Sequence, residues 1–238
     1  MTESTTETST PETHTRKEQI KSAYKTIGSN SLYDGMITNS TLLGSIINKV
    51  VWNYSKEDND LIIQQVFNDI ENNFSGKLLD VPVGTGVLTM PLYSTLPQAD
   101  ITCLDYSKEM LEQAKEKAEK LKLTNIQFQQ GDVGHLEFED NTFDIVLSMN
   151  GFHAFPEKEA AYNETYRVLK PGGKFIGCFY IKDECSRTDK FINTIYVKKG
   201  YFTPPFETLE SLTERLKKMY SSVDISNVKS LIRFACTK

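Results

Sequence analysis

Apolar positions follow a helical period up to residue 73 and then change to an alternation of short runs. One helical stripe contains Leu42, Leu43, Ile46, Ile47, Val50 and Val51, and a second contains Leu61, Ile62, Val66, Phe67 and Ile70. Glycine, asparagine and serine between Tyr24 and Thr41 are typical of a loop. We therefore predict an N-terminal helical lid over residues 16–73.

Beyond residue 73, short apolar runs alternate with stretches that have one apolar face. The runs predict buried strands at residues 77–81, 101–105, 126–128, 143–149 and 174–180. Helices are predicted between them, at residues 88–96, after the capping residue Ser107, and at residues 157–169. Two further runs, 223–228 and 230–237, are joined by a tight link and predict an antiparallel hairpin.

Strands that alternate with helices form a mainly parallel sheet with helices on both faces, because each parallel connection has to cross over. We predict an α/β fold with a doubly wound, Rossmann-like sheet of seven strands, mainly parallel and ending in the antiparallel hairpin. This domain covers residues 74–238, with a lid insertion around residues 181–206. Residues 1–15 are mostly Thr, Ser and Glu and predict a disordered tail, since such a segment buries too little apolar surface to fold.

Charge and cysteine usage narrow the class of partner and the compartment. The net charge of −5 over 238 residues argues against a nucleic-acid partner, which usually meets a basic face, and favours a small molecule. The four cysteines lack the spacing of a metal site, so we predict no metal, and free thiols fit a cytoplasmic protein. No apolar run approaches the roughly 20 residues that span a bilayer. The sequence leaves the oligomeric state open.

Polar residues stand where four predicted strands end. They are, in strand order, Asp80 with the Gly84-Thr85-Gly86 turn, Asp105, Asp132 and Asn150. The carboxyl ends of parallel strands share one edge, which is where ligands of open α/β sheets bind. Glycines let the backbone approach a ligand closely, and a carboxylate at the second strand end can accept hydrogen bonds from two ribose hydroxyls. The sequence therefore predicts a nucleoside-shaped pocket at this edge.

The segment Leu78–Gly86 resembles the first motif of the class I S-adenosylmethionine (SAM)-dependent methyltransferases, a group that includes the quinone C-methyltransferases. Phe143–Val146 resembles their fourth-strand motif, and Arg167–Gly173 resembles the stretch before their fifth strand. Pro82 is a departure, because the family usually has glycine there and proline has no N–H to offer. The resemblance implies SAM as the cofactor and assigns its binding to Asp80, Pro82, Gly84, Thr85, Gly86, Asp105, Tyr106, Met110, Asp132, Val133 and Asn150.

The resemblance also implies transfer of the SAM methyl group to a small-molecule acceptor. His153 follows the fourth strand and is the predicted general base, because an imidazole takes up protons near neutral pH. The acceptor is predicted to be apolar or planar, since the two lid segments carry many aromatic residues. The predicted acceptor-pocket residues are Tyr24, Tyr33, His153, Tyr180, Tyr201 and Phe202.

Two alternatives that keep SAM binding stay open, and one on the same fold is disfavoured. The first is a quinone C-methyltransferase, because Tyr33-Asp34 and Trp52 resemble the start of those enzymes. The second is a non-catalytic SAM-binding scaffold, because Pro82 alters the first motif. A nicotinamide-dependent oxidoreductase needs the pattern G-x-G-x-x-G, and Thr89 stands where its third glycine would be.

Overall fold

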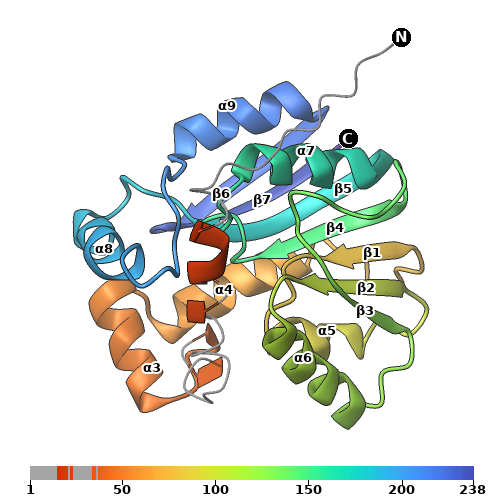
Figure 1. Ribbon diagram of the computed structural model, residues 1–238, viewed down its shortest axis with the longest axis horizontal. Coiled ribbons are helices and arrows are strands. Elements are labelled where there is room, and N and C mark those ends of the chain that lie inside the picture. Colours follow the sequence, from red (N-terminus) through yellow and green to blue (C-terminus); the bar gives the residue numbers. More distant parts are fainter. Residues whose placement is uncertain (1–14, 21, 24–33, 36) are drawn as a thin grey trace.

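A computed structural model describes residues 15–20, 22–23, 34–35 and 37–238 (Figure 1). The strands are β1 (Lys77–Asp80), β2 (Asp100–Asp105), β3 (Ile126–Gln130), β4 (Phe143–Met149), β5 (Leu169–Tyr180), β6 (Ser222–Val228) and β7 (Leu231–Thr237). The helices are α3 (Leu42–Ile47), α4 (Lys56–Phe67), α5 (Thr89–Tyr93), α6 (Lys108–Lys120), α7 (Lys158–Val168), α8 (Ser186–Phe191) and α9 (Leu209–Met219). The π-helical turns η1 (Asn48–Trp52) and η2 (Ile192–Tyr196) follow α3 and α8, and residues 15–20 are helical as well.

The described strands form one seven-stranded sheet in the order β3-β2-β1-β4-β5-β7-β6. Neighbours among β1 to β5 pair in parallel, whereas β7 lies antiparallel to both β5 and β6. The chain starts in the middle of the sheet at β1, runs outward to β3, and then returns to β4 on the other side of β1. The predicted doubly wound, Rossmann-like sheet with a C-terminal antiparallel hairpin is confirmed.

Element boundaries follow local sequence, and the two largest differences from the predicted boundaries lie at α5 and β5. Ser107 caps α6 as expected, because its Oγ accepts a hydrogen bond from the Met110 N–H at 3.3 Å. Helix α5 is shorter than the predicted range 88–96 and ends at Tyr93. Strand β5 begins earlier than the predicted residue 174, since Leu169 already pairs with Phe143 of β4 before the ladder shifts register.

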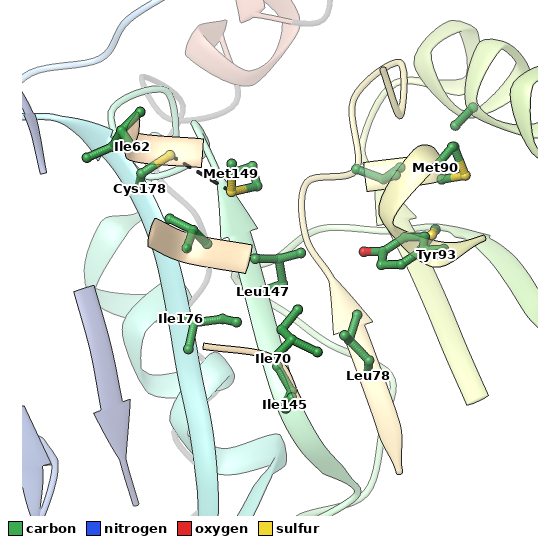
Figure 2. Packing of buried hydrophobic residues seen from close by; sticks show 14 of the residues in the cluster. Ile62, Ile70, Leu78, Met90, Tyr93, Ile145, Leu147, Met149, Ile176 and Cys178 are labelled. Carbon is green, nitrogen blue, oxygen red and sulfur yellow. Dashed lines mark hydrogen bonds between the residues drawn. The ribbon is translucent and has the colours of Figure 1, made fainter. Parts of the chain in front are cut away.

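The sheet carries an apolar layer on each face. Helices α4, α5 and α6 cover one face, and Figure 2 shows part of their cluster around Leu78, Leu147 and Ile176. Helices α7 and α9 cover the other face, on a cluster that includes Leu79 and Phe175. The adjacent residues Leu78 and Leu79 thus serve opposite layers, as the pleat of a strand requires. This explains why the predicted central strands read as continuous apolar runs.

Several other expectations can be compared with the described part of the chain. No helix in it is long and apolar enough to cross a bilayer, and no cluster of His, Cys, Asp and Glu in it is arranged to hold a metal ion. The cysteines are free, and three of them are buried: Cys103, Cys178 and Cys236. The predicted tail lies outside the described residues except for Thr15, at which a helical stretch begins.

Candidate functional site

A cavity opens at the carboxyl ends of β1 to β4, the edge at which the sequence predicts a nucleoside site. Its walls include all predicted cofactor residues except Asp80, namely Pro82, Gly84, Thr85, Gly86, Asp105, Tyr106, Met110, Asp132, Val133 and Asn150. The parallel order of the strands brings these residues together although about 70 positions separate the first from the last.

The turn after β1 needs glycine for two different reasons. Gly84 and Gly86 have φ angles of +57° and +68°, a region that side-chain-bearing residues avoid. A Cβ at Gly86 would lie 2.8 Å from Met90 Cγ, whereas a Cβ at Gly84 would meet nothing within 4 Å. Gly86 is therefore required for packing of the turn on α5, and Gly84 leaves open space at the cavity wall.

Pro82, the departure from the usual motif, packs against the loop after β4. A Cβ placed on Gly151 would lie 2.4 Å from Pro82 Cδ, so this proline and this glycine occupy complementary space. The neighbouring amides still serve the sheet, because Val81 N–H donates to Leu147 O and Val83 N–H donates to Leu104 O. The missing N–H of Pro82 thus lies between two amides that are already used, which explains how the chain tolerates proline here.

Asp105 joins the two strand ends that form the centre of the site. Its Oδ2 accepts a hydrogen bond from the Gly84 N–H at 2.8 Å, and its Oδ1 accepts one from the Ser107 N–H at 2.8 Å. Burial raises the pKa of the Asp105 carboxyl to about 6, although these backbone donors act in the opposite direction. At neutral pH the group is a buried, oriented carboxylate, which is the form that accepts hydrogen bonds from hydroxyls.

Asp80 lies beneath the turn and not in the cavity wall. Its Oδ2 accepts a hydrogen bond from the Tyr93 hydroxyl at 2.8 Å, and its Oδ1 has no hydrogen-bond partner among the described residues. Complete burial raises the pKa of the Asp80 carboxyl to about 7. The sequence prediction that Asp80 binds the cofactor places it close to the site, but the described cavity does not reach it.

Residues of the N-terminal segment complete the cavity, and sequence reasoning did not find them. Lys17, Ile20 and Ile37 line it. Lys17 Nζ pairs with Asp132 Oδ2 at 2.7 Å and with Glu157, a residue of the loop before α7 that also lines the cavity. No local pattern marks Lys17, because its partners lie more than 100 positions away in the sequence.

A second contact of the N-terminal segment reaches the glycine turn. The Thr85 hydroxyl donates to Asp34 Oδ1 at 2.6 Å, and Lys117 Nζ of α6 lies 3.0 Å from Asp34 Oδ2. Further along, Arg16 donates to the carbonyl oxygens of Val197 and Phe202. The described N-terminal residues thus contact the loops after β1, β3 and β4, and the segment that follows η2.

The predicted acceptor-pocket residues that the structure describes do not line this cavity. Tyr24 and Tyr33 lie outside the described residues, whereas Tyr180, Tyr201 and Phe202 belong to an aromatic cluster around Trp52. The Trp52 ring centroid lies 5.8 Å from that of Tyr180 and 6.0 Å from that of Phe202. These rings fill space against each other, so the cluster forms a packed support beside the cavity.

His153, the predicted base, is held in the same support. Its ring stacks on Phe202 with centroids 3.9 Å apart, and its Nδ1 accepts a hydrogen bond from the Tyr180 N–H at 3.2 Å. Burial, with a smaller effect of the Lys158 charge, lowers the pKa of His153 to about 3. The imidazole is therefore neutral, and one nitrogen is already engaged by the backbone.

The residues of the cavity fit SAM. Asp105 keeps acceptor capacity for ribose hydroxyls, because a carboxylate offers about four acceptor sites. Asp132 suits the exocyclic amine of adenine, and Tyr106, Met110 and Val133 provide apolar contacts of the kind an adenine ring needs. The open space at Gly84 leaves room for the amino-acid end of the molecule.

Comparisons with known proteins place the chain in a methyltransferase family. A family described as "Methyltransferase domain" matches residues 72–220. Demethylmenaquinone methyltransferase of Staphylococcus haemolyticus is 31% identical over 188 residues, which cover 79% of this chain and 71% of that protein.

Solved structures share the fold at low sequence identity. A SAM-dependent methyltransferase of Aquifex aeolicus matches with a TM-score of 0.56 at 20% identity, over 74% of this chain and 88% of its own. Phosphoethanolamine N-methyltransferase 2 of Haemonchus contortus in complex with SAM matches with a TM-score of 0.62 at 19% identity, over 84% of this chain and 58% of its own. The family match spans strands β1 to β5 together with the glycine turn, Asp105 and Asp132, so it covers the strand-end residues of the cavity.

Proposed function

This chain belongs to the class I SAM-dependent methyltransferases, and we propose that it methylates a small, apolar or planar acceptor that binds under its N-terminal segment. The observation that carries this proposal is the composition of the cavity wall beyond the cofactor residues. That part is mainly apolar and includes Ile20, Ile37, Leu88, Ala154, Phe155 and Pro156 beside the charged residues Lys17 and Glu157. An apolar wall favours an acceptor whose binding removes apolar surface from water.

When bound, SAM supplies both the electrophilic methyl group and the leaving group of the transfer. The residues of this chain have to position it and exclude water. Asp105 orients the ribose, Asp132 the adenine, and the Lys17 and Asp34 contacts hold the N-terminal segment across the entrance. Among the described wall residues, those with charged side chains are Lys17, Asp105, Asp132 and Glu157.

His153 stays the proposed base for an acceptor that has to lose a proton. The position of His153 equally supports a structural role. Its ring packs on Phe202, and its Nδ1 accepts a hydrogen bond from the Tyr180 N–H. Replacement by alanine separates the two roles. A loss of turnover below tenfold, with SAM binding intact, contradicts the base.

A quinone C-methyltransferase is the second candidate, and the relative from S. haemolyticus favours it. The apolar wall suits a ring system of that kind. An acceptor panel distinguishes the candidates: a reduced naphthoquinone tests a carbon acceptor, a catechol an oxygen acceptor and an arylamine a nitrogen acceptor. Turnover of the reduced naphthoquinone alone supports a quinone C-methyltransferase.

Calorimetry with SAM and with S-adenosylhomocysteine tests the cofactor step. Micromolar binding of both is expected. Absence of binding contradicts the proposed function, and binding without turnover of any acceptor supports the scaffold alternative.

A further inference from the structure

The most exposed large apolar side chains of the described residues form one row. Leu42, Ile46 and Val50 are 82%, 51% and 58% exposed. They are four positions apart along α3 and η1, which run on without a break. Side chains at that spacing lie on one side of a helix, so the row is continuous. Apolar patches of this kind on a protein surface commonly mark a binding surface.

Cations are enriched in the segment that carries this row and in the segment that packs against it, although the whole protein is acidic. Residues 37–55 and 185–206 together contain five cations and one acid, in a chain of net charge −5. The cations are Lys49, Arg187, Lys190, Lys198 and Lys199, all of them exposed and none in a recorded ion pair within the described part of the chain. The one acid, Asp189, accepts hydrogen bonds from the Tyr180 hydroxyl and the Asp183 N–H.

The two segments form one surface, here called the α3–α8 face and defined by residues 42–50 and 187–199. The Thr188 hydroxyl donates to Val51 O at 2.8 Å, and Arg187 Nη2 donates to Lys49 O at 3.4 Å. Figure 1 shows α8 beside α3 at one end of the molecule, away from α6. These contacts place Arg187 next to Lys49 on the helix that carries the apolar row, and Lys190, Lys198 and Lys199 follow on the same segment as Arg187.

We propose that the α3–α8 face docks the protein on an anionic lipid bilayer. An apolar row bordered by lysine and arginine suits the boundary between acyl chains and phosphate groups, where the row is buried and the cations meet negative charge. A second copy of this chain fits less well, because a two-fold contact would bring the same five cations against each other. Docking does not depend on which acceptor is methylated.

The α3–α8 face also lies next to the cover of the cavity. Arg16 binds the carbonyls of Val197 and Phe202, and the neighbouring Lys17 lines the cavity. A bilayer in contact with this face would meet the segment under which the acceptor is proposed to enter. An apolar acceptor dissolved in the bilayer would then reach the site without crossing water.

Co-sedimentation of the full chain with vesicles tests the proposal. We expect binding to mixed phosphatidylcholine–phosphatidylglycerol vesicles and little binding to phosphatidylcholine alone. Each cation near the surface contributes about fivefold to the partition coefficient. The charge reversal Lys198→Glu with Lys199→Glu should therefore lower binding more than tenfold, and Ile46→Ser with Val50→Ser should lower it by at least as much, since acyl contacts are lost.

The matched control changes the last residue of α6 and the residue that follows it. Leu121 is 44% exposed and Lys120 is exposed, so Lys120→Glu with Leu121→Ser changes one charge and one apolar side chain away from the face. This variant should bind vesicles like the wild type. All variants should keep their SAM affinity by calorimetry, which shows that they are folded.

Three results would overturn the proposal. One is the absence of binding to anionic vesicles by protein that binds SAM. Another is equal binding by the wild type and both face variants. The third is self-association that Ile46→Ser with Val50→Ser abolishes, without vesicle binding, because the row would then be a contact between copies. Failure of the wild-type protein to bind SAM would contradict the proposed function and not the docking proposal.

Discussion

Among single residues, Asp105 has the clearest consequence for cofactor binding. Both of its carboxylate oxygens accept backbone hydrogen bonds, from Gly84 and Ser107. An amide in its place would point an N–H₂ group at one of these donors. We expect Asp105→Asn to raise the dissociation constant of SAM by about 100-fold, given the usual strength of charged hydrogen bonds. Calorimetry measures this.

Asp100→Asn is the control for Asp105→Asn, because Asp100 is exposed at the start of the same strand. It should leave SAM affinity unchanged. A change below threefold in Asp105→Asn would show that Asp105 does not hold the cofactor.

Pro82 and Gly151 are predicted to depend on each other. A Cβ at position 151 would lie 2.4 Å from Pro82 Cδ and 2.7 Å from Phe155 Cζ. We expect Gly151→Ala to destabilise the protein by about 1–3 kcal/mol, as overpacking does. Adding Pro82→Gly should recover part of this loss, because it removes the closest contact and leaves those with Phe155 Cζ and with Ser148 Oγ at 2.9 Å. Urea unfolding measures both.

Gly134→Ala is the matched control, since a Cβ there would lie 3.4 Å from its nearest neighbour, an ordinary contact. If Gly151→Ala costs no more than this control, Pro82 and Gly151 are not coupled.

At the scale of elements, the sequence predicts best where a short segment determines its own structure. Strand β4 has the predicted bounds because its apolar run is limited on both sides by polar residues. The start of α6 follows from the Ser107 cap. The start of β5 was missed because Leu169 pairs with Phe143, a residue 26 positions away.

The residues of the candidate site also fall into two groups, those that the local sequence predicts and those that it does not. Its strand-end residues could be predicted, because parallel strands place their carboxyl ends at one edge. Lys17 and Asp34 could not, since their ion pairs depend on how the N-terminal segment crosses the cavity. The surroundings of His153 depend on the ring of Phe202, 49 positions further along, so its burial could not be inferred from its neighbours.

The N-terminal segment is an element whose contacts lead to a prediction. Lys17 stands between the carboxylates of Asp132 and Glu157, and its loss leaves two like charges unpaired at the cavity. We expect Lys17→Met to speed amide hydrogen exchange in residues 15–20 and to speed SAM dissociation by about tenfold, which corresponds to ~1.4 kcal/mol. Exchange mass spectrometry and stopped-flow measure the two.

Lys56→Met is the control, because Lys56 forms an exposed pair with Asp60 on α4. It should change neither quantity. Unchanged exchange and dissociation in Lys17→Met would mean that the N-terminal segment does not close the cavity.

At the scale of the whole molecule, three fully buried titratable groups, Asp80, Asp105 and His153, contribute strongly to the dependence of stability on pH. Burial raises the pKa of Asp80 to about 7 and that of Asp105 to about 6. Unfolded aspartates titrate near 3.9, so the folded state binds more protons between these limits. Both groups therefore make the protein more stable as the pH falls from about 7 towards 4.

His153 acts in the opposite direction. Burial lowers its pKa to about 3, whereas an unfolded histidine titrates near 6.5. Between these values the folded state binds fewer protons, so the stabilisation by the neutral ring is complete above pH ~6.5 and is lost as the pH falls towards 3. The loss amounts to about 1.4 kcal/mol per pH unit.

Because the raised pKa values of the two aspartates together outweigh this loss between about pH 4 and 6, the wild-type curve alone does not isolate His153. The variant His153→Phe keeps a ring against Phe202 and cannot be protonated. It loses the acceptor for the Tyr180 N–H, so it should be less stable at pH 7. The difference in unfolding free energy between wild type and variant should shrink by about 1.4 kcal/mol for each pH unit below about 6. Urea unfolding at several pH values measures it. A difference that stays constant with pH would mean that His153 binds protons equally in the folded and unfolded states, so that its folded pKa lies near 6.5 and suits proton transfer at neutral pH.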